Sequence, residues 1–254
     1  MKRLLLPVFF ISMMTFSVNV YSQKIIYVDG LTYIKSSREL ANGPISTYYK
    51  TGQLKQENNY KNGKVISTKT YSQDGDLEGL WNYKDEKMHG VVESYYKGGQ
   101  LKARWNYKGG LKHGVVASYY RGGQLKARLN YKDGEKHNLT EYYYQTGNLK
   151  ETAKYRDGKL DGISEVYDQL SDLKIRRYFK DGKSQGPERY YDFNDNPLQG
   201  TMERFHFNGK IKSRTNYTEG LRDGLVETYF GNGAINNRYN FKNGKPEGLM
   251  ETLC

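Results

Sequence analysis

Polar and apolar residues alternate along this chain in short runs that are separated by glycine-rich stretches. In the segment 101–108, apolar or aromatic residues at odd numbers alternate with lysine, arginine and asparagine at even numbers. An alternation of period two is typical of a β-strand with two different faces. Glycine interrupts the runs every eight to eleven residues, and no stripe of period 3.6 survives these interruptions. We therefore predict an all-β chain of short strands.

The pattern recurs as a repeat of mostly 24 residues. The segment 90–113 is nearly copied by 114–137, and weaker copies run in both directions. If the first residue of each unit is position 0, then positions 5 and 17 are aromatic, position 11 is leucine or isoleucine, and positions 9 and 20 are glycine. Glycine reaches positive φ without steric cost, so both glycine positions predict turns and each unit predicts a β-hairpin. One hairpin alone is marginally stable, so neighbouring hairpins must stabilise one another in a long antiparallel meander.

These observations divide the chain into four regions. We expect a signal peptide at 1–22, a capping hairpin at 23–42, hairpin repeats at 43–247 and a C-terminal stub at 248–254. One unit near 186–199 is degenerate, because it is short and carries Asn-Pro where its second strand should begin. Full units begin at Gly43, Ile66, Gly90, Gly114, Asn138, Gly162, Gly200 and Gly224.

Composition agrees with a thin structure that has little core. The chain has 254 residues, of which 14% are aromatic, including 25 Tyr, but only 36% are hydrophobic. A packed two-layer domain of this length needs more Val, Ile and Leu, whereas a disordered chain would not carry so many aromatic residues. Tyrosine can bury its ring while its hydroxyl stays in water, which suits a sheet of this kind.

The first residues differ from the repeats. Lys2 and Arg3 precede an apolar run from Leu4 to Phe16, and the segment ends at Ser22. A charged start, a short apolar run and a small residue at its end are typical of an export signal, and the run is short for a transmembrane helix. We expect cleavage after Ser22 and a periplasmic, outer-surface or extracellular protein with no later transmembrane segment. Loss of the two cations lowers the formal net charge from +12 to +10.

The repeats predict two different faces for the sheet. We expect the aromatics at positions 5 and 17 and the leucine at position 11 on the inward face, where Trp81 or Trp105 adds bulk at position 15. Lysine at position 12, arginine at 14, asparagine at 16 and lysine at 18 fall on the opposite face by strand parity. This opposite face is the candidate binding surface. Its candidate residues are Lys102, Arg104, Asn106, Lys108, Lys126, Arg128, Asn130, Lys132, Arg176 and Arg214.

The units resemble a known repeat family. The segments 119–134 and 143–162 follow the pattern Tyr-x-x-x-Gly-x-Leu-Lys-x-x-x-x-Tyr-x-x-Gly of the bacterial MORN repeat variant, and the resemblance covers about residues 43–250. The resemblance implies a twisted, single-layer antiparallel sheet that serves as a scaffold or binding platform. Some members of the variant family carry an antitoxin label.

No constellation for catalysis, metal binding or a cofactor stands apart from the repeats. His89, His113 and His137 share one repeat position, so in-register stacking separates them by about 9–10 Å, whereas zinc ligands lie about 2.0–2.1 Å from one ion. The lone Cys254 excludes an internal disulfide, and the glycine-rich turns are too short for a phosphate-binding loop. We predict solvated glutamates at position 3, no metal, no cofactor and no enzymatic activity.

Two interpretations of the basic rows remain open. The cations keep the sheet soluble and pair across strands with glutamate at position 3, or they form a platform for lipopolysaccharide phosphate, acidic glycan or anionic lipid. Nucleic acid also favours mixed aromatic and basic surfaces, but an exported protein is not expected to meet it. We predict an exported binding or scaffold protein that engages a protein partner or a surface polyanion. The alternatives are an antitoxin-like inhibitor of a toxin partner and a carbohydrate-active enzyme.

Overall fold

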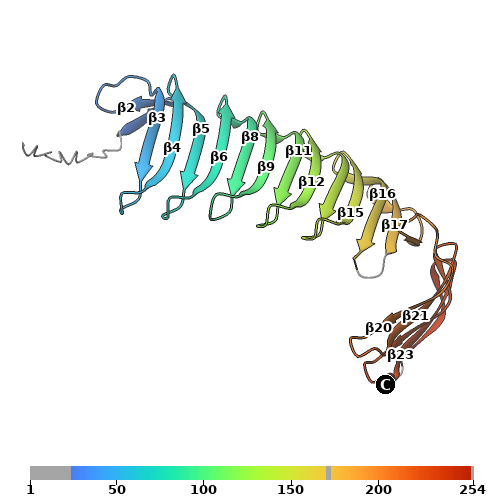
Figure 1. Cartoon of the computed structure of the whole chain (residues 1–254). Coiled ribbons are helices and arrows are strands. Elements are labelled where there is room, and N and C mark those ends of the chain that lie inside the picture. Colours follow the sequence, from blue (N-terminus) through green and yellow to red (C-terminus); the bar gives the residue numbers. More distant parts are fainter. Residues whose placement is uncertain (1–23, 170–172, 253–254) are drawn as a thin grey trace, which may run out of the picture.

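Every regular element that the computed structural model describes, over residues 24–169 and 173–252, is a β-strand (Figure 1). The expected signal peptide at 1–22 and the terminal Cys254 lie outside the described residues. The strands form a two-stranded hairpin at the N-terminal end, a long first sheet and a five-stranded second sheet. The predicted architecture of antiparallel hairpins in an all-β chain is confirmed.

The first sheet is a meander in which strands pair antiparallel in chain order. Its main strands are β3 (Gly43–Tyr48), β4 (Leu54–Lys61), β5 (Lys64–Tyr71), β6 (Leu77–Lys84), β8 (Gly90–Tyr95), β9 (Leu101–Lys108), β11 (Gly114–Tyr119), β12 (Leu125–Lys132), β14 (Asn138–Tyr143), β15 (Leu149–Arg156), β16 (Lys159–Asp168), β17 (Leu173–Lys180) and β19 (Arg189–Asp192). In the described ranges no ladder joins β3 to β19, and Figure 1 shows β3 and β17 far apart, so the sheet is open.

Short strands extend the ends of four long strands. They are β7 (Lys87–Met88), β10 (Leu111–Lys112), β13 (Glu135–Lys136) and β18 (Lys183–Ser184), which pair with β6, β9, β12 and β17. The next strand then opens on a residue with positive φ. In β11 this first residue is Gly114, with a φ of 84°. The ladder between neighbouring units is therefore interrupted: β9 pairs with β11 only at Ala117↔Arg104 and Ser118↔Ala103.

The turn near position 20 explains the recurring glycine there. Asp133 and Gly134 have φ values of 50° and 92°, which is the pair of positive angles that a type I′ hairpin turn requires. The matching pair Asp85 and Glu86 has φ values of 50° and 63°. Glu86 thus keeps the turn geometry at the one unit of the repeat where the sequence lacks glycine at this position.

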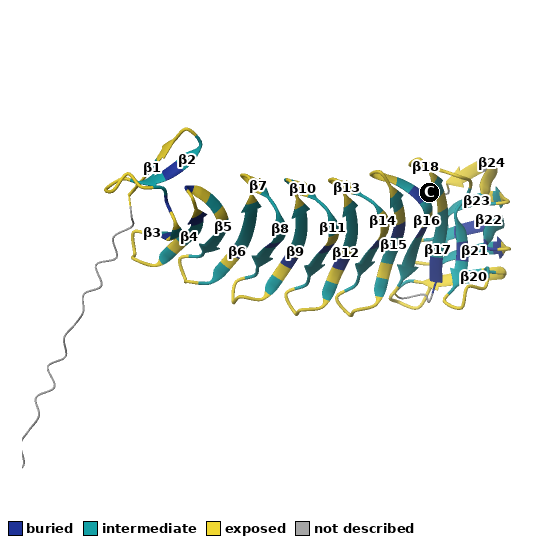
Figure 2. Cartoon of the chain, turned by 90° about the horizontal axis from the view of Figure 1, so that it is seen from above, coloured by how far each residue is buried: buried dark blue, intermediate teal, exposed yellow. Residues whose placement is uncertain are grey.

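The two faces of the first sheet carry different side chains, and the turns at its edges are exposed (Figure 2). We call one the core face, because positions 2 and 4 of the first strand and 13, 15 and 17 of the second contribute buried side chains such as Val92, Ala103 and Thr140. We call the other the arginine face, because it carries the arginine at position 14. Exposed residues gather at the turns on both edges of the sheet.

The aromatic at position 5 lies on the arginine face, so its expected place on the inward face is wrong. Tyr95 donates its hydroxyl proton to Glu93 Oε2 at 2.5 Å, and Glu93 stands directly opposite Arg104 in the strand register. Successive side chains of a strand point to opposite faces, so positions 3 and 5 must share one. A register shift between Ser94 and Tyr95 separates Tyr95 from the parity of the following strand.

The N-terminal hairpin caps the first sheet. It consists of β1 (Ile25–Val28) and β2 (Leu31–Ile34). The backbone N–H of Thr32 donates to the carbonyl of Gly63 at 2.9 Å, and Ile34 packs against a small cluster of buried residues that includes Ile45 and Tyr60. These contacts attach the hairpin to the first repeat unit.

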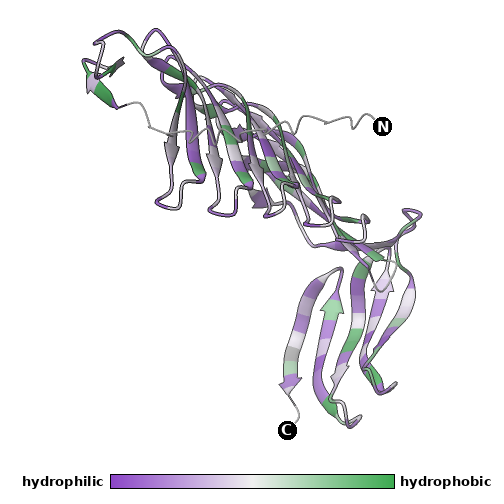
Figure 3. Cartoon of the chain, turned by 60° about the vertical axis from the view of Figure 1, so that its left-hand side comes forward, coloured by the Kyte–Doolittle hydropathy of each residue, from purple (hydrophilic) through white to green (hydrophobic). Residues whose placement is uncertain are grey.

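The second sheet begins after the degenerate unit. It consists of β20 (Gly200–Phe205), β21 (Ile211–Thr218), β22 (Leu221–Tyr229), β23 (Ile235–Lys242) and β24 (Lys245–Thr252). Asp192 caps the preceding turn by accepting the backbone N–H of Asn196 at 2.8 Å, and Pro197 has no N–H with which to continue a ladder. The first sheet therefore ends there. Figure 3 shows hydrophilic and hydrophobic segments alternating along the strands of the second sheet.

Backbone hydrogen bonds hold the second sheet against the end of the first. Tyr190 N–H donates to the carbonyl of Gly220 at 2.7 Å, and Leu198 N–H donates to the carbonyl of Tyr190 at 3.0 Å. The ring of Tyr190 lies 4.9 Å from that of Tyr217.

Across 24–169 and 173–252, no helix is long and apolar enough to cross a membrane.

Candidate functional site

The arginine face is built from a repeated group of three side chains, which we call the rung. In the unit that starts at Gly90, Arg104 Nε donates to Glu93 Oε1 at 2.7 Å while Tyr95 donates to the other carboxylate oxygen. The Glu93 side chain retains only 12% of its exposure. The hydrogen bonds from Tyr95 and Arg104 hold the pKa of Glu93 below its ordinary value. Burial and the hydrogen bond to Glu93 raise the pKa of Tyr95 to about 12.

The rung recurs because positions 3, 5 and 14 recur. Two further complete rungs are Glu165–Tyr167–Arg176 and Glu227–Tyr229–Arg238. Where position 3 is Ala117, Arg128 instead reaches Glu141 of the next unit at 3.3 Å. Arg214 pairs with Glu203 at 2.7 Å. The predicted arginines are thus each bonded to a carboxylate, as the interpretation with cross-strand pairs expected.

The asparagines at position 16 close the interrupted ladders between units. Asn106 Nδ2 donates to the carbonyl of Val115 at 2.5 Å, and the carbonyl of Asn106 accepts the N–H of His113 at 2.9 Å. Asn130 repeats this arrangement with Leu139, at 2.6 Å. These amides therefore support the backbone where strand pairing fails, and one of the two Nδ2 protons of each is used in doing so.

Lysines at position 12 lie over tyrosines that the sequence analysis did not single out. Lys102 Nζ is 5.8 Å from the centre of the Tyr96 ring, and Lys126 Nζ is 5.6 Å from that of Tyr120, distances typical of cation–π contacts. Tyr96 also donates its hydroxyl proton to the carbonyl of Tyr119 at 2.8 Å, which links one unit to the next. The recurring Tyr-Tyr pair at positions 5 and 6 is the sequence signal that could have revealed these tyrosines.

Two of the lysines at position 18 are free of such contacts. Lys108 and Lys132 are exposed beside the tight turns, and neither forms an ion pair within the part of the chain that the structure describes. Lys108 and Lys132 therefore place two unpaired positive charges at one edge of the arginine face.

A row of exposed aliphatic side chains accompanies the rungs. Val115, Leu139 and Ile163 occupy position 1 in successive units and keep 45%, 45% and 43% of their exposure. Position 1 shares strand parity with positions 3 and 5. A shallow groove on the arginine face is lined by Val115 together with Arg104 and Arg128. The row therefore places apolar surface between neutralised arginines.

The structure brings some predicted site residues together and separates others. Arg104, Asn106 and Arg128 line the same groove. Arg176 belongs to a rung further along the first sheet, and Arg214 belongs to the second sheet. The predicted surface is thus divided between two sheets.

No metal centre emerges from the described residues. No group of three or more His, Cys, Asp or Glu side chains there could hold a metal ion. His113 Nδ1 lies 3.3 Å from Asp133 Oδ1, and His137 Nδ1 lies 3.7 Å from Asp157 Oδ1, so each histidine faces an aspartate of the following turn. The arrangement offers ion pairs and apolar contacts to a partner.

Five segments of the chain match the family described as MORN repeat variant. They are residues 41–62, 88–108, 112–133, 136–157 and 198–219. The first four lie in the first sheet and the last spans the start of the second, so the resemblance found in the sequence is confirmed. A comparison with curated protein sequences finds no match.

The solved structures that resemble this chain do so distantly. The chain is similar to a chain in the crystal structure of TcdB2-TccC3-Cdc42, with 11% identity and a TM-score of 0.22 over 87% of this chain and 14% of that one. It is also similar to a porin-like protein from Bacteroides uniformis, with 10% identity and a TM-score of 0.19 over 82% of this chain and 87% of that one. TM-scores this low carry no argument about function.

Proposed function

Because the chain carries five repeats of the MORN variant type, which generally serve as non-enzymatic binding or scaffold modules, we propose that it is an exported scaffold that docks an acidic protein partner on its arginine face. The partner lies along the first sheet and contacts several units at once. Equivalent side chains recur about every 9–10 Å along the sheet, which suits an extended partner surface.

The exposed aliphatic row is the observation that carries this proposal. Val115, Leu139 and Ile163 present apolar surface beside tyrosines and arginines. The buried core of a protein interface is more apolar than its rim, and tyrosine and arginine, which flank this row, are enriched among the residues that supply most of the binding energy. An acidic glycan has no apolar chain to pack against the aliphatic side chains, so the row favours a protein over that ligand.

Charge defines the chemistry of the partner. The arginines of the rungs are already bonded to glutamates, so they add little net charge. Lys102, Lys108, Lys126 and Lys132 remain exposed, and the whole chain has a formal net charge of +12. The complementary surface carries aliphatic anchors surrounded by Asp or Glu, which steer its approach.

Two further parts of the proposal rest on the sequence and on side-chain contacts. Export is inferred from the signal-like segment at 1–22. The absence of enzymatic activity is inferred from the glutamates at position 3, because Glu93, Glu165 and Glu227 each bond an arginine and a tyrosine and are not free for acid–base chemistry. An antitoxin-like role would be one particular case of the same docking, with a toxin as the partner.

The test compares variants in affinity capture from an extract of the native envelope. The double variant Leu139→Asp/Ile163→Asp places charge in the aliphatic row, while Leu111→Asp changes a residue of the short strand β10 that is 51% exposed. We expect the wild type and Leu111→Asp to retain one acidic protein that the double variant loses. With that protein purified, calorimetry should show at least a tenfold weaker affinity for the double variant.

Other results contradict the proposal. Equal capture by all three proteins, or loss of capture in Leu111→Asp as well, would remove the aliphatic row from the interface. Retention on heparin that weakens steeply with salt, persists in the double variant and disappears in Lys102→Glu/Lys126→Glu would assign the surface to a polyanion instead.

A further inference from the structure

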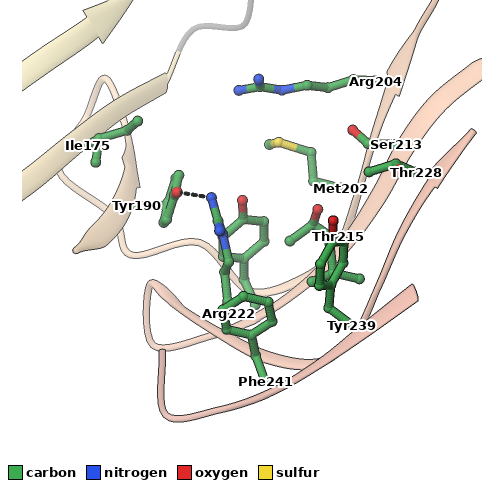
Figure 4. A pocket seen from close by; sticks show the side chains of 12 residues that line it. Ile175, Tyr190, Met202, Arg204, Ser213, Thr215, Arg222, Thr228, Tyr239 and Phe241 are labelled. Carbon is green, nitrogen blue, oxygen red and sulfur yellow. Dashed lines mark hydrogen bonds between the residues drawn. The ribbon is translucent and has the colours of Figure 1, made fainter. Parts of the chain in front are cut away.

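A cavity of ≈ 420 Å³ opens where the first sheet meets the second (Figure 4). Ile175 and Tyr190 line it from the first sheet, and Tyr217, Tyr239 and Phe241 line it from the second. Small-molecule sites commonly enclose about 300–1,000 Å³ and are lined by aromatic and apolar side chains with a few polar groups. The cavity has both the size and the lining of such a site.

Two guanidinium groups line the cavity together with these rings. Arg222 lies 5.1 Å from the centre of the Tyr190 ring and 5.5 Å from that of Phe241, and it donates a hydrogen bond to the Tyr190 hydroxyl. Arg222 Nε is buried and has no hydrogen-bond partner among the described residues. Figure 4 shows the Arg204 guanidinium on the same side of the second sheet as that of Arg222. A buried N–H without a partner is costly, so the Arg222 guanidinium is incompletely satisfied within the fold.

These cations are weakly neutralised compared with the rungs. Arg222 lies 3.5 Å from Glu188, but Glu188 is already bonded to Arg177 at 2.6 and 3.0 Å. Arg204 reaches Asp168 at only 3.4 Å. No carboxylate is among the residues that line the cavity. The cavity therefore combines excess positive charge with an apolar wall.

Arg222 also departs from its counterparts in other units. It occupies position 22, where Lys112 and Lys136 lie over the rings of Tyr131 and Tyr155 at 5.2 and 4.8 Å. Those lysines sit on a continuous part of the first sheet. At the junction the sheet is broken, arginine replaces lysine, and a cavity opens beside the cation.

We propose that the junction cavity binds a small organic carboxylate. The carboxylate accepts hydrogen bonds from the guanidinium groups of Arg222 and Arg204, and the apolar body packs against Met202, Tyr239 and Phe241. Guanidinium groups suit this role because they donate to a carboxylate in a planar, charge-assisted geometry. The bound molecule contacts both sheets and fixes one against the other. This site is independent of partner docking on the arginine face of the first sheet.

The test is calorimetric titration of the full mature chain with naphthalene-2-carboxylate. We expect saturable binding of one molecule, and at least tenfold weaker binding of the neutral 2-naphthylmethanol and of acetate, which lacks an apolar body. Arg222→Gln and Arg204→Gln should each weaken the carboxylate at least tenfold. Arg121→Gln is the matched control, because it removes an equal charge from an exposed turn of the first sheet and should bind as the wild type does.

Several outcomes would overturn the proposal. These are no saturable binding, equal binding of the alcohol and the carboxylate, or unchanged affinity in Arg204→Gln. Inorganic phosphate that binds as tightly as the aromatic carboxylate would show that the apolar wall contributes nothing, and it too would refute the assignment. Circular dichroism verifies folding, and Arg204→Gln alone decides the matter if Arg222→Gln fails to fold.

Discussion

Glu93 serves two partners with its two carboxylate oxygens, and this explains the chemistry of the whole arginine face. Tyr95 and Arg104 both donate to it, so the positive charge of the Arg104 guanidinium is balanced by the Glu93 carboxylate. Charge-assisted hydrogen bonds in a half-buried setting are stronger than surface ion pairs in water. The arginine row is therefore mainly structural, and the aliphatic residues beside it are the better candidates for recognition.

The rung makes stability depend on acid in a defined direction. Hydrogen bonds from Tyr95 and Arg104 lower the pKa of Glu93 in the folded chain, so the carboxylate stabilises the fold above its unfolded pKa of 4.5. That contribution is lost as the pH falls below 4.5. We expect Glu93→Gln to lower the free energy of unfolding by about 1–2 kcal/mol at pH 7. The difference from the wild type should shrink in urea unfolding at pH 3.

Glu78→Gln provides the control for this prediction. Glu78 is an exposed residue of β6, the main strand before the one that carries Glu93, and it forms no ion pair within the described residues. Its substitution should leave the unfolding free energy nearly unchanged at both pH values. A constant difference between Glu93→Gln and the wild type from pH 7 to pH 3 would show that the carboxylate charge is not what stabilises the rung.

At the scale of the hairpin, glycine meets two separate requirements at turns with positive φ. At Gly200, with φ of 78°, a Cβ atom would meet nothing within 4 Å, so glycine is needed there only for its backbone angle. At Gly220, with φ of 74°, a Cβ atom would lie 2.7 Å from the carbonyl oxygen of Tyr190. Glycine there also permits the close approach of the two sheets.

Alanine substitution separates these two requirements. Gly200→Ala should cost about 1 kcal/mol from backbone strain alone. Gly220→Ala should cost clearly more, because the added methyl group collides with the Tyr190 carbonyl and disturbs the hydrogen bond from Tyr190 N–H to Gly220. Thermal unfolding measures both costs, and amide hydrogen exchange at Tyr190 reports the junction. Equal costs and unchanged exchange at Tyr190 would mean that the sheets adapt without strain.

Hairpins were predictable from the sequence because their causes are local. The glycines at positions 9 and 20 and the alternation between them specify turns and strands within a single unit. The face of Tyr95 was misassigned because the aromatic residues were grouped by hydrophobicity, whereas parity with Glu93 decides the direction of the side chain. The role of Tyr96 was missed because its partner, the carbonyl of Tyr119, lies in the next unit.

At the scale of the molecule, an open meander gives an elongated shape. The thirteen main strands of the first sheet, at about 4.8 Å per step, extend over about 60 Å. A compact domain of this length has a radius of gyration of about 17 Å. We expect small-angle X-ray scattering of the mature chain to give a larger radius and a maximum dimension above 60 Å.

The scattering measurement needs two protein concentrations. If the radius of gyration is the same at both, the elongation belongs to the single chain and not to self-association. A radius near 17 Å would contradict an open sheet and would require the second sheet to fold back over the first.

The sequence alone determined the repeat, its period, the hairpin in each unit and the alternation of residues along the second strand of each unit. These features follow from local backbone preferences and from strand alternation, which copies of one unit all share. Only the tertiary structure decided which arginines are paired with glutamates and where the first sheet ends. Whether Arg104 is free or bonded depends on its register with Glu93, and the cavity at Arg222 exists because two sheets meet at Gly220. The ion pairing of the arginines and the position of the cavity both depend on contacts between strands, which the sequence of one strand does not reveal.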